Sequence, residues 1–338
     1  MKNNTHPNIL IVICLSLFSL NACKKQATFD GPSIEELYSS FKLLEDFKAD
    51  KTTVSFAAPE SVTFTAKFNK VVAWTITING ATSKAKKIIT GQGKQIDATN
   101  ALWKGSTTEL PMFRAENVTA TLSIDGQTTT YNLPIEIKTT AINNGLVIAD
   151  FETGLLSSWT KFIQSGASMD FAVKDDDLAP QATKYLKMHG IVNWDWLIGL
   201  IDFPASAYGT SKTLPLSTNS DEVYFNCLIY GVPNTNESIV LFQFREDENA
   251  DGNISATADD EYDLQVKVNW VGWKLVSIKY TDLPYLNNGQ AATPKGNSQH
   301  NPDKIGKISM LHLADPAGGL ASTKIDYIIF TQYGPLVP

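Results

Sequence analysis

Two stretches decide the fold: Glu222 to Tyr230 reads EVYFNCLIY, and Ser238 to Arg245 reads SIVLFQFR. Alternate residues are strongly apolar in both. The apolar sets are Val223, Phe225, Cys227 and Ile229 in the first and Val240, Phe242 and Phe244 in the second. Because successive side chains of a strand point to opposite faces, each stretch predicts a β-strand with one apolar face and one mixed polar and aromatic face.

Eight further stretches also read as strands. They lie near Leu146–Asp150, Phe171–Lys174, Lys184–His189, Leu197–Phe203, Tyr262–Val268, Trp273–Tyr280, Ile305–Leu313 and Lys324–Thr331. Pro, Gly, Asn and Asp fill the loops between them, and no amphipathic helical pattern longer than two turns stands out. So many short strands in one unit predict a β-jelly-roll sandwich for residues 143–338.

Residues 51–142 show the same period of two in a threonine-rich sequence. Val71–Ile78 reads VVAWTITI and Val118–Ile124 reads VTATLSI, and an Asn-Gly or Asp-Gly turn signal follows each. The pattern predicts an immunoglobulin-like sandwich without a disulfide, which would act as a spacer. Trp74 alternates with Thr on its strand, so we assign it to the core. The predicted fold class is therefore all-β.

The N-terminal residues read as a signal peptide. Residues 1–22 have a positive start at Lys2 and an apolar segment, Ile9–Leu20, that is too short to span a bilayer comfortably. The segment ends in Leu-Asn-Ala-Cys23, which resembles a bacterial lipobox, and in that family the cysteine is lipidated. Acyl chains on Cys23 would anchor the protein to a membrane. An ordinary secretory signal that happens to carry a cysteine is the alternative.

Residues 23–50 predict a polar tether and one short amphipathic helix. Ser33 can cap the helix, with Glu36 three residues later. Leu37, Phe41, Leu44 and Phe47 follow at helical spacing and carry the helix to about Phe47.

Composition excludes several classes of protein. The net charge is −7, and no run of Lys and Arg longer than two follows the N-terminus, so nucleic-acid binding is excluded. The sequence has no Gly-x-Ser-x-Gly elbow, Walker A loop or dinucleotide fingerprint. With Cys14 in the signal and Cys23 lipidated, Cys227 has no partner for an intramolecular disulfide and is expected to be a buried hydrophobe.

Short motifs carry a resemblance to a known family. They are Ile148-Ala-Asp-Phe-Glu-Thr-Gly154 followed by Trp159, Lys184-Tyr-Leu-Lys-Met188, Gly272-Trp-Lys-Leu-Val276 and Lys324-Ile-Asp-Tyr-Ile-Ile-Phe330. In this order they resemble a carbohydrate-binding-module jelly roll of the galactose-binding-like type. With the lipobox and the spacer, the chain resembles a surface glycan-binding lipoprotein of a polysaccharide-utilisation system.

The resemblance implies a location, partners and an ion. It implies an outer-membrane lipoprotein that binds a polysaccharide or oligosaccharide and passes it to an outer-membrane importer or a nearby glycosidase. Lys24 and Lys25 follow the cysteine, where surface-exported relatives often carry acidic residues. The sequence therefore does not decide whether the anchored protein faces the cell surface or the periplasm. It also implies a structural calcium joining the first and last strands at Asp150, Glu152 and Asp326.

Proteins recognise sugars with aromatic ring faces and planar polar groups. We choose the candidate binding residues by these side-chain types. Trp194 and Trp196 flank Asp195 at a strand entrance and are expected to form a platform, with core packing as the alternative. The mixed strand faces are expected to form one sheet surface that carries His189, Asn226, Tyr230, Gln243 and Arg245. A plain solvent-facing sheet would show the same polarity. His312 could join this face or be an interior histidine.

An acidic loop gives a second candidate for calcium. Asp247, Asn249 and Asp251 alternate before Gly252, as in the first half of a calcium loop, and the expected glutamate at the twelfth position is absent. Asp259, Asp260 and Glu261 follow directly and could complete the shell. The predicted ligands are Asp247, Asn249, Asp251, Asp259 and Glu261. A solvated acidic hairpin is the alternative.

Binding is the preferred function. A glycosidase needs two carboxylates placed about 5–10 Å apart, and no pattern on one strand face supplies them. We therefore expect non-catalytic capture of a glycan without an organic cofactor. A neutral polysaccharide fits the lack of a cationic patch better than a uronate. A jelly-roll glycoside hydrolase or polysaccharide lyase and a structural or adhesion lipoprotein are the alternatives.

Overall fold

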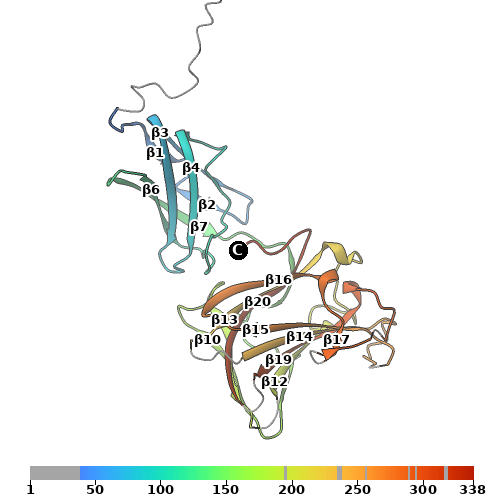
Figure 1. Ribbon diagram of the computed structural model, residues 1–338. Helices are drawn as coiled ribbons and strands as arrows, with labels where there is room; N and C mark the ends of the chain where they lie inside the picture. Colours follow the sequence, from blue (N-terminus) through green and yellow to red (C-terminus); the bar gives the residue numbers. More distant parts are fainter. Residues whose placement is uncertain are drawn as a thin grey trace, which may run out of the picture.

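The computed structural model describes residues 39–193, 196–233, 238–255, 257–287, 290–293, 295–315 and 319–338. Over these residues the protein is all-β, as predicted, and folds as two units joined near residue 140 (Figure 1). The signal segment and Cys23 lie outside the described residues, so lipidation stays a prediction. Among the described residues, no helix is both long and apolar enough to cross a membrane.

Seven strands form the sheet of the first unit. They are β1 (Leu43–Ala49), β2 (Thr53–Ser55), β3 (Val62–Gly80), β4 (Lys86–Ile96), β5 (Leu102–Trp103), β6 (Asn117–Ile124) and β7 (Thr130–Thr139). The order is β1-β3-β6-β7-β2, and β4 and β5 also pair with the long β3. Trp74 is 2% exposed in the core, as predicted, and the ring lies against Gly91, where a Cβ would approach it to 2.2 Å. The immunoglobulin-like class stays a prediction.

The predicted helix is wrong at its C-terminal end. Residues Leu43–Ala49 form strand β1, which pairs antiparallel with β3. Phe47 stacks on Phe64 with ring centroids 5.7 Å apart, whereas Leu44, expected on the apolar helix face, is 62% exposed. Pairing with the long neighbouring strand therefore overrides the helical spacing of the apolar residues.

The second unit is a sandwich of two antiparallel sheets. One sheet has the order β10-β11-β20-β13-β16, with β8 also on β20, and the other has the order β15-β14-β19-β12-β9. The strands of the first sheet are β8 (Gly145–Ala149), β10 (Ser168–Asp175), β11 (Lys184–Ile191), β13 (Val223–Gly231), β16 (Gly272–Lys279) and β20 (Leu320–Gln332). Those of the second are β9 (Thr160–Ile163), β12 (Leu197–Pro204), β14 (Ser238–Glu246), β15 (Glu261–Val268) and β19 (Ile305–Ala314).

The strand order confirms the jelly roll. From β11 to β20 the chain crosses repeatedly between the two sheets, so sequence neighbours such as β13 and β14 belong to different sheets. All ten predicted strands are present, and the short β9 and the hairpin of β17 (Leu286–Asn287) and β18 (Gln290–Ala291) were missed. In the part of the chain that the structure describes, the helices are single 3-10 turns at Ala205–Ala207, Ser220–Glu222, Tyr280–Asp282 and Pro302–Lys304.

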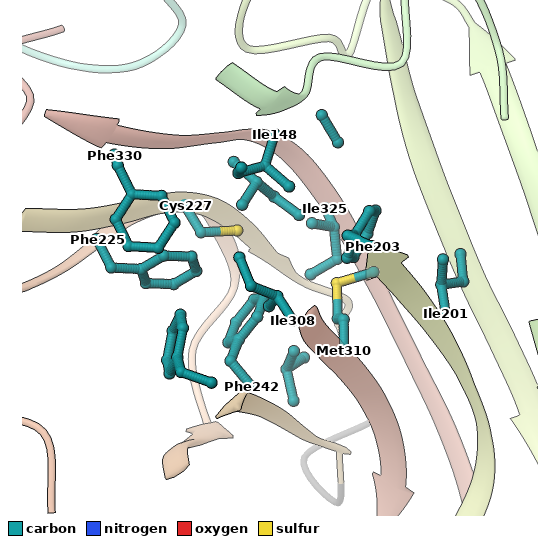
Figure 2. Close-up of a cluster of buried hydrophobic side chains, with 14 of the residues drawn as sticks. Ile148, Ile201, Phe203, Phe225, Cys227, Phe242, Ile308, Met310, Ile325 and Phe330 are labelled. Atoms are coloured by element: carbon teal, nitrogen blue, oxygen red, sulfur yellow. The ribbon is translucent and has the colours of Figure 1, made fainter. Parts of the chain in front are cut away.

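Aromatic and aliphatic side chains from both sheets fill the space between them (Figure 2). The Phe225 ring on β13 meets those of Phe242, Phe244 and Phe330 edge-on at centroid distances of 4.8, 4.9 and 5.5 Å. Cys227 is fully buried beside them, as predicted, and burial raises the pKa of its thiol. The core thus fixes which strand residues point outward, where a ligand can reach them.

The two units touch through a small apolar cluster and backbone hydrogen bonds. Leu110 and Met112 of the first unit pack against Leu228, Tyr327, Ile329 and Leu336 of the second. The Met112 N–H donates to the Pro180 carbonyl at 2.7 Å, and the Thr107 N–H donates to the Pro338 carbonyl at 2.7 Å. The last residues of the chain are therefore part of the junction.

Candidate functional site

The predicted sugar-binding face is divided between two sheets. His189, Asn226 and Tyr230 belong to the sheet of β11 and β13, whereas Gln243 and Arg245 belong to the sheet of β14. All five point away from the shared core, so the two groups lie on opposite outer sides of the sandwich. The expectation of one surface carrying all five is wrong, because the jelly roll places consecutive strands in different sheets.

Asn226 has a structural role. It is fully buried, and its Nδ2 donates to the Thr331 Oγ1 at 2.9 Å. Its Oδ1 accepts from the Ser277 Oγ at 2.7 Å and from the Leu336 N–H at 3.0 Å. These bonds fasten the C-terminal segment to β13 and leave no surface for a ligand.

Tyr230 and His189 are half-buried on the same outer side. The Tyr230 ring meets Trp273 edge-on at 5.3 Å, and the Lys324 Nζ lies 4.0 Å from the ring centroid. Trp273 is half-buried on this outer side, and its Nε1 donates to the Leu178 carbonyl at 2.6 Å. The aromatic rings of this face therefore pack mainly on one another.

The tryptophan platform stays a prediction. Trp194 and Asp195 lie outside the described residues, and Trp196 is 48% exposed just before β12. His312 is fully buried on the core side of β19, so the interior alternative is confirmed for it. Burial lowers its pKa to about 4.

A groove opens at one end of the other outer side. Its volume is about 660 Å³, within the range of small-molecule sites. The floor is formed by the neighbouring residues Lys307, Arg245 and Glu261 on β19, β14 and β15. The walls include Asp247, residues 252–255, Asp259 and Asp260, together with residues 285–287 at the hairpin of β17, which Figure 1 shows beside the ends of these strands.

Polar side chains on and beside the groove floor hold one another in place. The Arg245 Nε lies 2.5 Å from the Glu261 Oε2, and the Arg245 Nη2 donates to the Gln243 Oε1 at 3.0 Å. The Gln243 Nε2 donates to the other Glu261 oxygen at 3.2 Å, which closes a ring of three residues. Lys307 forms an ion pair with Asp202 at 3.1 Å. Fixed donors and acceptors of this kind suit recognition of a polar ligand, because little side-chain freedom is lost on binding.

The charges that line the groove are balanced. Its described lining carries four cationic side chains, Lys212, Arg245, Lys295 and Lys307, and four carboxylates, Asp247, Asp259, Asp260 and Glu261. A neutral ligand rich in hydroxyl groups can use both kinds, since each hydroxyl donates one hydrogen bond and accepts others. A polyanion would gain no net attraction from this lining.

Calcium at Asp247, Asn249, Asp251, Asp259 and Glu261 stays a prediction, and the structure shows what these side chains contact within the protein. The Asp247 carboxylate accepts hydrogen bonds from the Asp251 and Gly252 N–H groups, and Asp259 accepts from the Glu248 and Ser255 N–H groups. Glu261 pairs with Arg245, as described above. The side chains of the predicted set thus hold the loop backbone and the groove floor.

Two carboxylates of the second predicted calcium site, Glu152 and Asp326, also accept hydrogen bonds from the protein backbone. Glu152 accepts hydrogen bonds from the N–H groups of Thr183 and Lys184 at 2.9 and 2.6 Å. Asp326 is fully buried, its Oδ1 accepts from the Tyr327 N–H, and its Oδ2 has no partner. Burial raises its pKa far above the ordinary value. Calcium at Asp150, Glu152 and Asp326 stays a prediction.

A different acidic cluster was missed. Among the described residues, Glu246, Glu248 and Asp260 form the one group of three acidic, His or Cys side chains whose ligand atoms all lie within 4.8 Å of one another. The signal was available, because the alternation of β14 places Glu246 on the same face as Phe242 and Phe244. The predicted strand ends at Arg245, one residue before Glu246, and the predicted calcium loop begins at Asp247.

Burial shapes the acidity of this cluster. It raises the pKa of Glu246 to about 9, although hydrogen bonds from Tyr280 and the Asn301 backbone act in the opposite direction. It also raises the pKa of Glu248. At Asp260, burial alone would raise the pKa, but hydrogen bonds, first from the Gly296 N–H and then from Tyr285, lower it below its ordinary value.

No protein-family model matches the chain, and no curated protein matches it. Solved structures that are similar to it include carbohydrate-binding modules. The family 11 module from Clostridium thermocellum, in complex with a β-1,3-1,4-mixed-linked tetrasaccharide, is 13% identical with a TM-score of 0.37, covering 57% of this chain and 97% of that one. SGBP-B from a complex xyloglucan utilization locus in Bacteroides uniformis is 11% identical with a TM-score of 0.34, covering 87% and 72%. The jelly-roll assignment rests on the strand order given above.

Proposed function

We propose that this protein binds a neutral polysaccharide or oligosaccharide without cleaving it, in the groove above Arg245, Glu261 and Lys307. The observation that carries the proposal is the groove itself, with its fixed polar floor and balanced charges. Its size admits a short run of sugar units, and its donors and acceptors match hydroxyl groups. Through lipidated Cys23, the protein would hold its ligand at the cell envelope, for import or for degradation by other proteins.

The hydrogen bonds that the groove carboxylates accept favour binding over hydrolysis. Each of the four accepts hydrogen bonds from the protein: Asp247 and Asp259 from loop N–H groups, Asp260 from Tyr285, and Glu261 from Arg245 and Gln243. A glycosidase needs one carboxylic acid free to give its proton to the glycosidic oxygen. Carboxylates engaged in this way fix the shape of the groove and are poor proton donors.

The test is retardation in native gels that contain one polysaccharide each. The protein without residues 1–23 would be run through mixed-linkage β-glucan, xylan, xyloglucan and polygalacturonate. We expect retardation by at least one neutral polymer and none by polygalacturonate. Retardation by no polymer would refute the binding function, and release of reducing sugar in the same buffer would favour the hydrolase instead.

A matched pair of variants tests the location. Lys307→Met removes a groove cation that is 27% exposed and paired with Asp202 at 3.1 Å. Lys279→Met removes a cation that is 30% exposed and paired with Asp221 at 2.6 Å, on the outer side of the other sheet. Loss of a charged hydrogen bond to the ligand should weaken binding about tenfold or more for Lys307→Met. Equal affinities for both variants would show that the glycan binds elsewhere.

A further inference from the structure

The cluster of Glu246, Glu248 and Asp260 lies next to the groove, and Asp260 is the member that lines it. Glu246 is the last residue of β14, Glu248 stands two residues later in the loop, and Asp260 immediately precedes β15. Glu246 and Asp260 are fully buried, and Glu248 is half-buried. Three carboxylates in so little space repel one another unless a positive charge or protons compensate them.

Two buried oxygens in this cluster have no hydrogen-bond partner. The Glu246 Oε1 accepts from the Tyr280 hydroxyl at 2.8 Å and the Asn301 N–H at 2.7 Å, while its Oε2 is buried and unpartnered. The Glu248 Oε2 accepts from the Asn297 Nδ2 at 2.7 Å, while its Oε1 is buried and unpartnered. Buried carboxylate oxygens without a donor are costly, so their presence in a pair points to a bound species.

Local charges do not balance the cluster. Asp260 accepts hydrogen bonds from the Tyr285 hydroxyl and from three N–H groups, those of residues 295, 296 and 298, which favour its ionised form. The nearby Asp259 adds negative charge around Glu248, and Lys304 is the cation that acts on it. The excess of negative charge favours a divalent cation.

We propose that Glu246, Glu248 and Asp260 bind a calcium ion. All available ligand atoms are oxygens, which excludes metals that prefer sulfur or nitrogen. Magnesium usually retains several waters, and two fully buried carboxylates leave little room for them. Calcium accepts six to eight oxygens in flexible geometry and takes carboxylates with one or both oxygens.

The ion would fix the groove wall. Asp260, Tyr285 and Lys295 line the groove, and Asp260 also holds residues 295–298 through their N–H groups. Calcium would therefore connect the end of β14, the start of β15 and this second segment. Ion binding can be measured with no glycan present, so its test is independent of the proposed function.

The test uses metal-free protein without residues 1–23. Calcium added after removal by chelator should raise the melting temperature by several degrees, because a ligand that binds only the folded state stabilises it. Terbium in place of calcium should give luminescence sensitised by the tyrosines near the site. Unchanged melting, with no terbium signal, would overturn the proposal in favour of a proton shared between Glu246 and Glu248.

Two variants of the same loop locate the ion. Glu248→Gln changes a half-buried ligand and should weaken calcium binding at least tenfold, measured by titration calorimetry. Asp251→Asn changes an exposed carboxylate that bonds the Asn253 N–H, and it should leave the affinity unchanged. The reverse result would place the ion in the loop of Asp247, Asn249 and Asp251 and overturn this assignment. If Glu248→Gln does not fold, Glu248→Asp, which keeps a carboxylate on a shorter chain, should weaken binding in the same direction.

Discussion

Acidification should unfold the jelly-roll unit through His312. This imidazole is fully buried, its Nδ1 lies 3.4 Å from the Thr323 Oγ1, and its Nε2 has no partner. Burial lowers its pKa to about 4, although a hydrogen bond with the Ala321 backbone acts in the opposite direction. The unfolded chain would bind the proton near pH 6.5 and the folded one near pH 4, so the stabilising effect of neutral His312 is present above pH 6.5 and is lost as the pH falls towards 4.

The size of the effect follows from the two pKa values. At about 1.4 kcal/mol per pH unit, the interval between 6.5 and about 4 corresponds to about 3 kcal/mol of unfolding free energy. The difference in unfolding free energy between wild type and His312→Leu should therefore shift by about that amount between pH 7 and pH 4. Urea unfolding followed by tryptophan fluorescence at a series of pH values would measure it.

The control is a second imidazole of the same sandwich, one that is half-buried on an outer face. His189→Gln changes a half-buried histidine on β11, and this variant should retain most of the wild-type pH dependence. If His312→Leu and wild type lose stability in parallel across the whole range, the buried imidazole does not drive acid unfolding. The reasoning from its burial would then be wrong.

Two further changes test the cores. Phe225→Ala removes a fully buried ring that contacts three other phenylalanines. The variant should lower the unfolding free energy of the second unit by about 3–5 kcal/mol, measured by urea unfolding. A loss below about 1 kcal/mol would contradict the packing described. Glu116 is 7% exposed and accepts hydrogen bonds from the N–H groups of Thr82, Ser83 and Arg114. Burial alone would raise the pKa of Glu116, but the hydrogen bonds from the Ser83 hydroxyl and from these N–H groups lower it below its ordinary value. Glu116→Gln should therefore cost the first unit about 1–3 kcal/mol at pH 7. The penalty should shrink as the wild-type carboxylate protonates below pH 4.5, and a penalty independent of pH would count against the carboxylate bonds.

The strands of the jelly roll were predictable because alternation survives in each of them. Phe225 and Phe242 point into the core as their patterns require, and Trp74 does the same in the first unit. The strand at Leu43–Ala49 was not predictable in this way. Its apolar residues fit a helix, and only the neighbouring β3, distant in sequence, decides the outcome.

The site was harder to predict than the fold. Arg245 and Gln243 were selected correctly as an outward pair, but the sequence does not say that β13 and β14 face opposite sides of the molecule. The alternation of Asp247, Asn249 and Asp251 predicts ion ligands, and the structure shows that these side chains also accept hydrogen bonds from the backbone of their own turn. Local spacing cannot distinguish a carboxylate that binds a backbone N–H from one that binds an ion.

The place of β20 in its sheet has a consequence for how the protein forms. β20 pairs with β8, β11 and β13, strands that lie about 90 to 180 residues earlier in the sequence, so it is the central member and also the last in order. During synthesis the first unit can complete its sheet once residue 139 has emerged from the ribosome, whereas the six-stranded sheet must wait for residue 332. Contacts so distant in sequence are typical of slow folding. Until β20 arrives, the edges of β11 and β13 are open to pairing with other chains, and a chaperone that covers them would raise the yield of native protein.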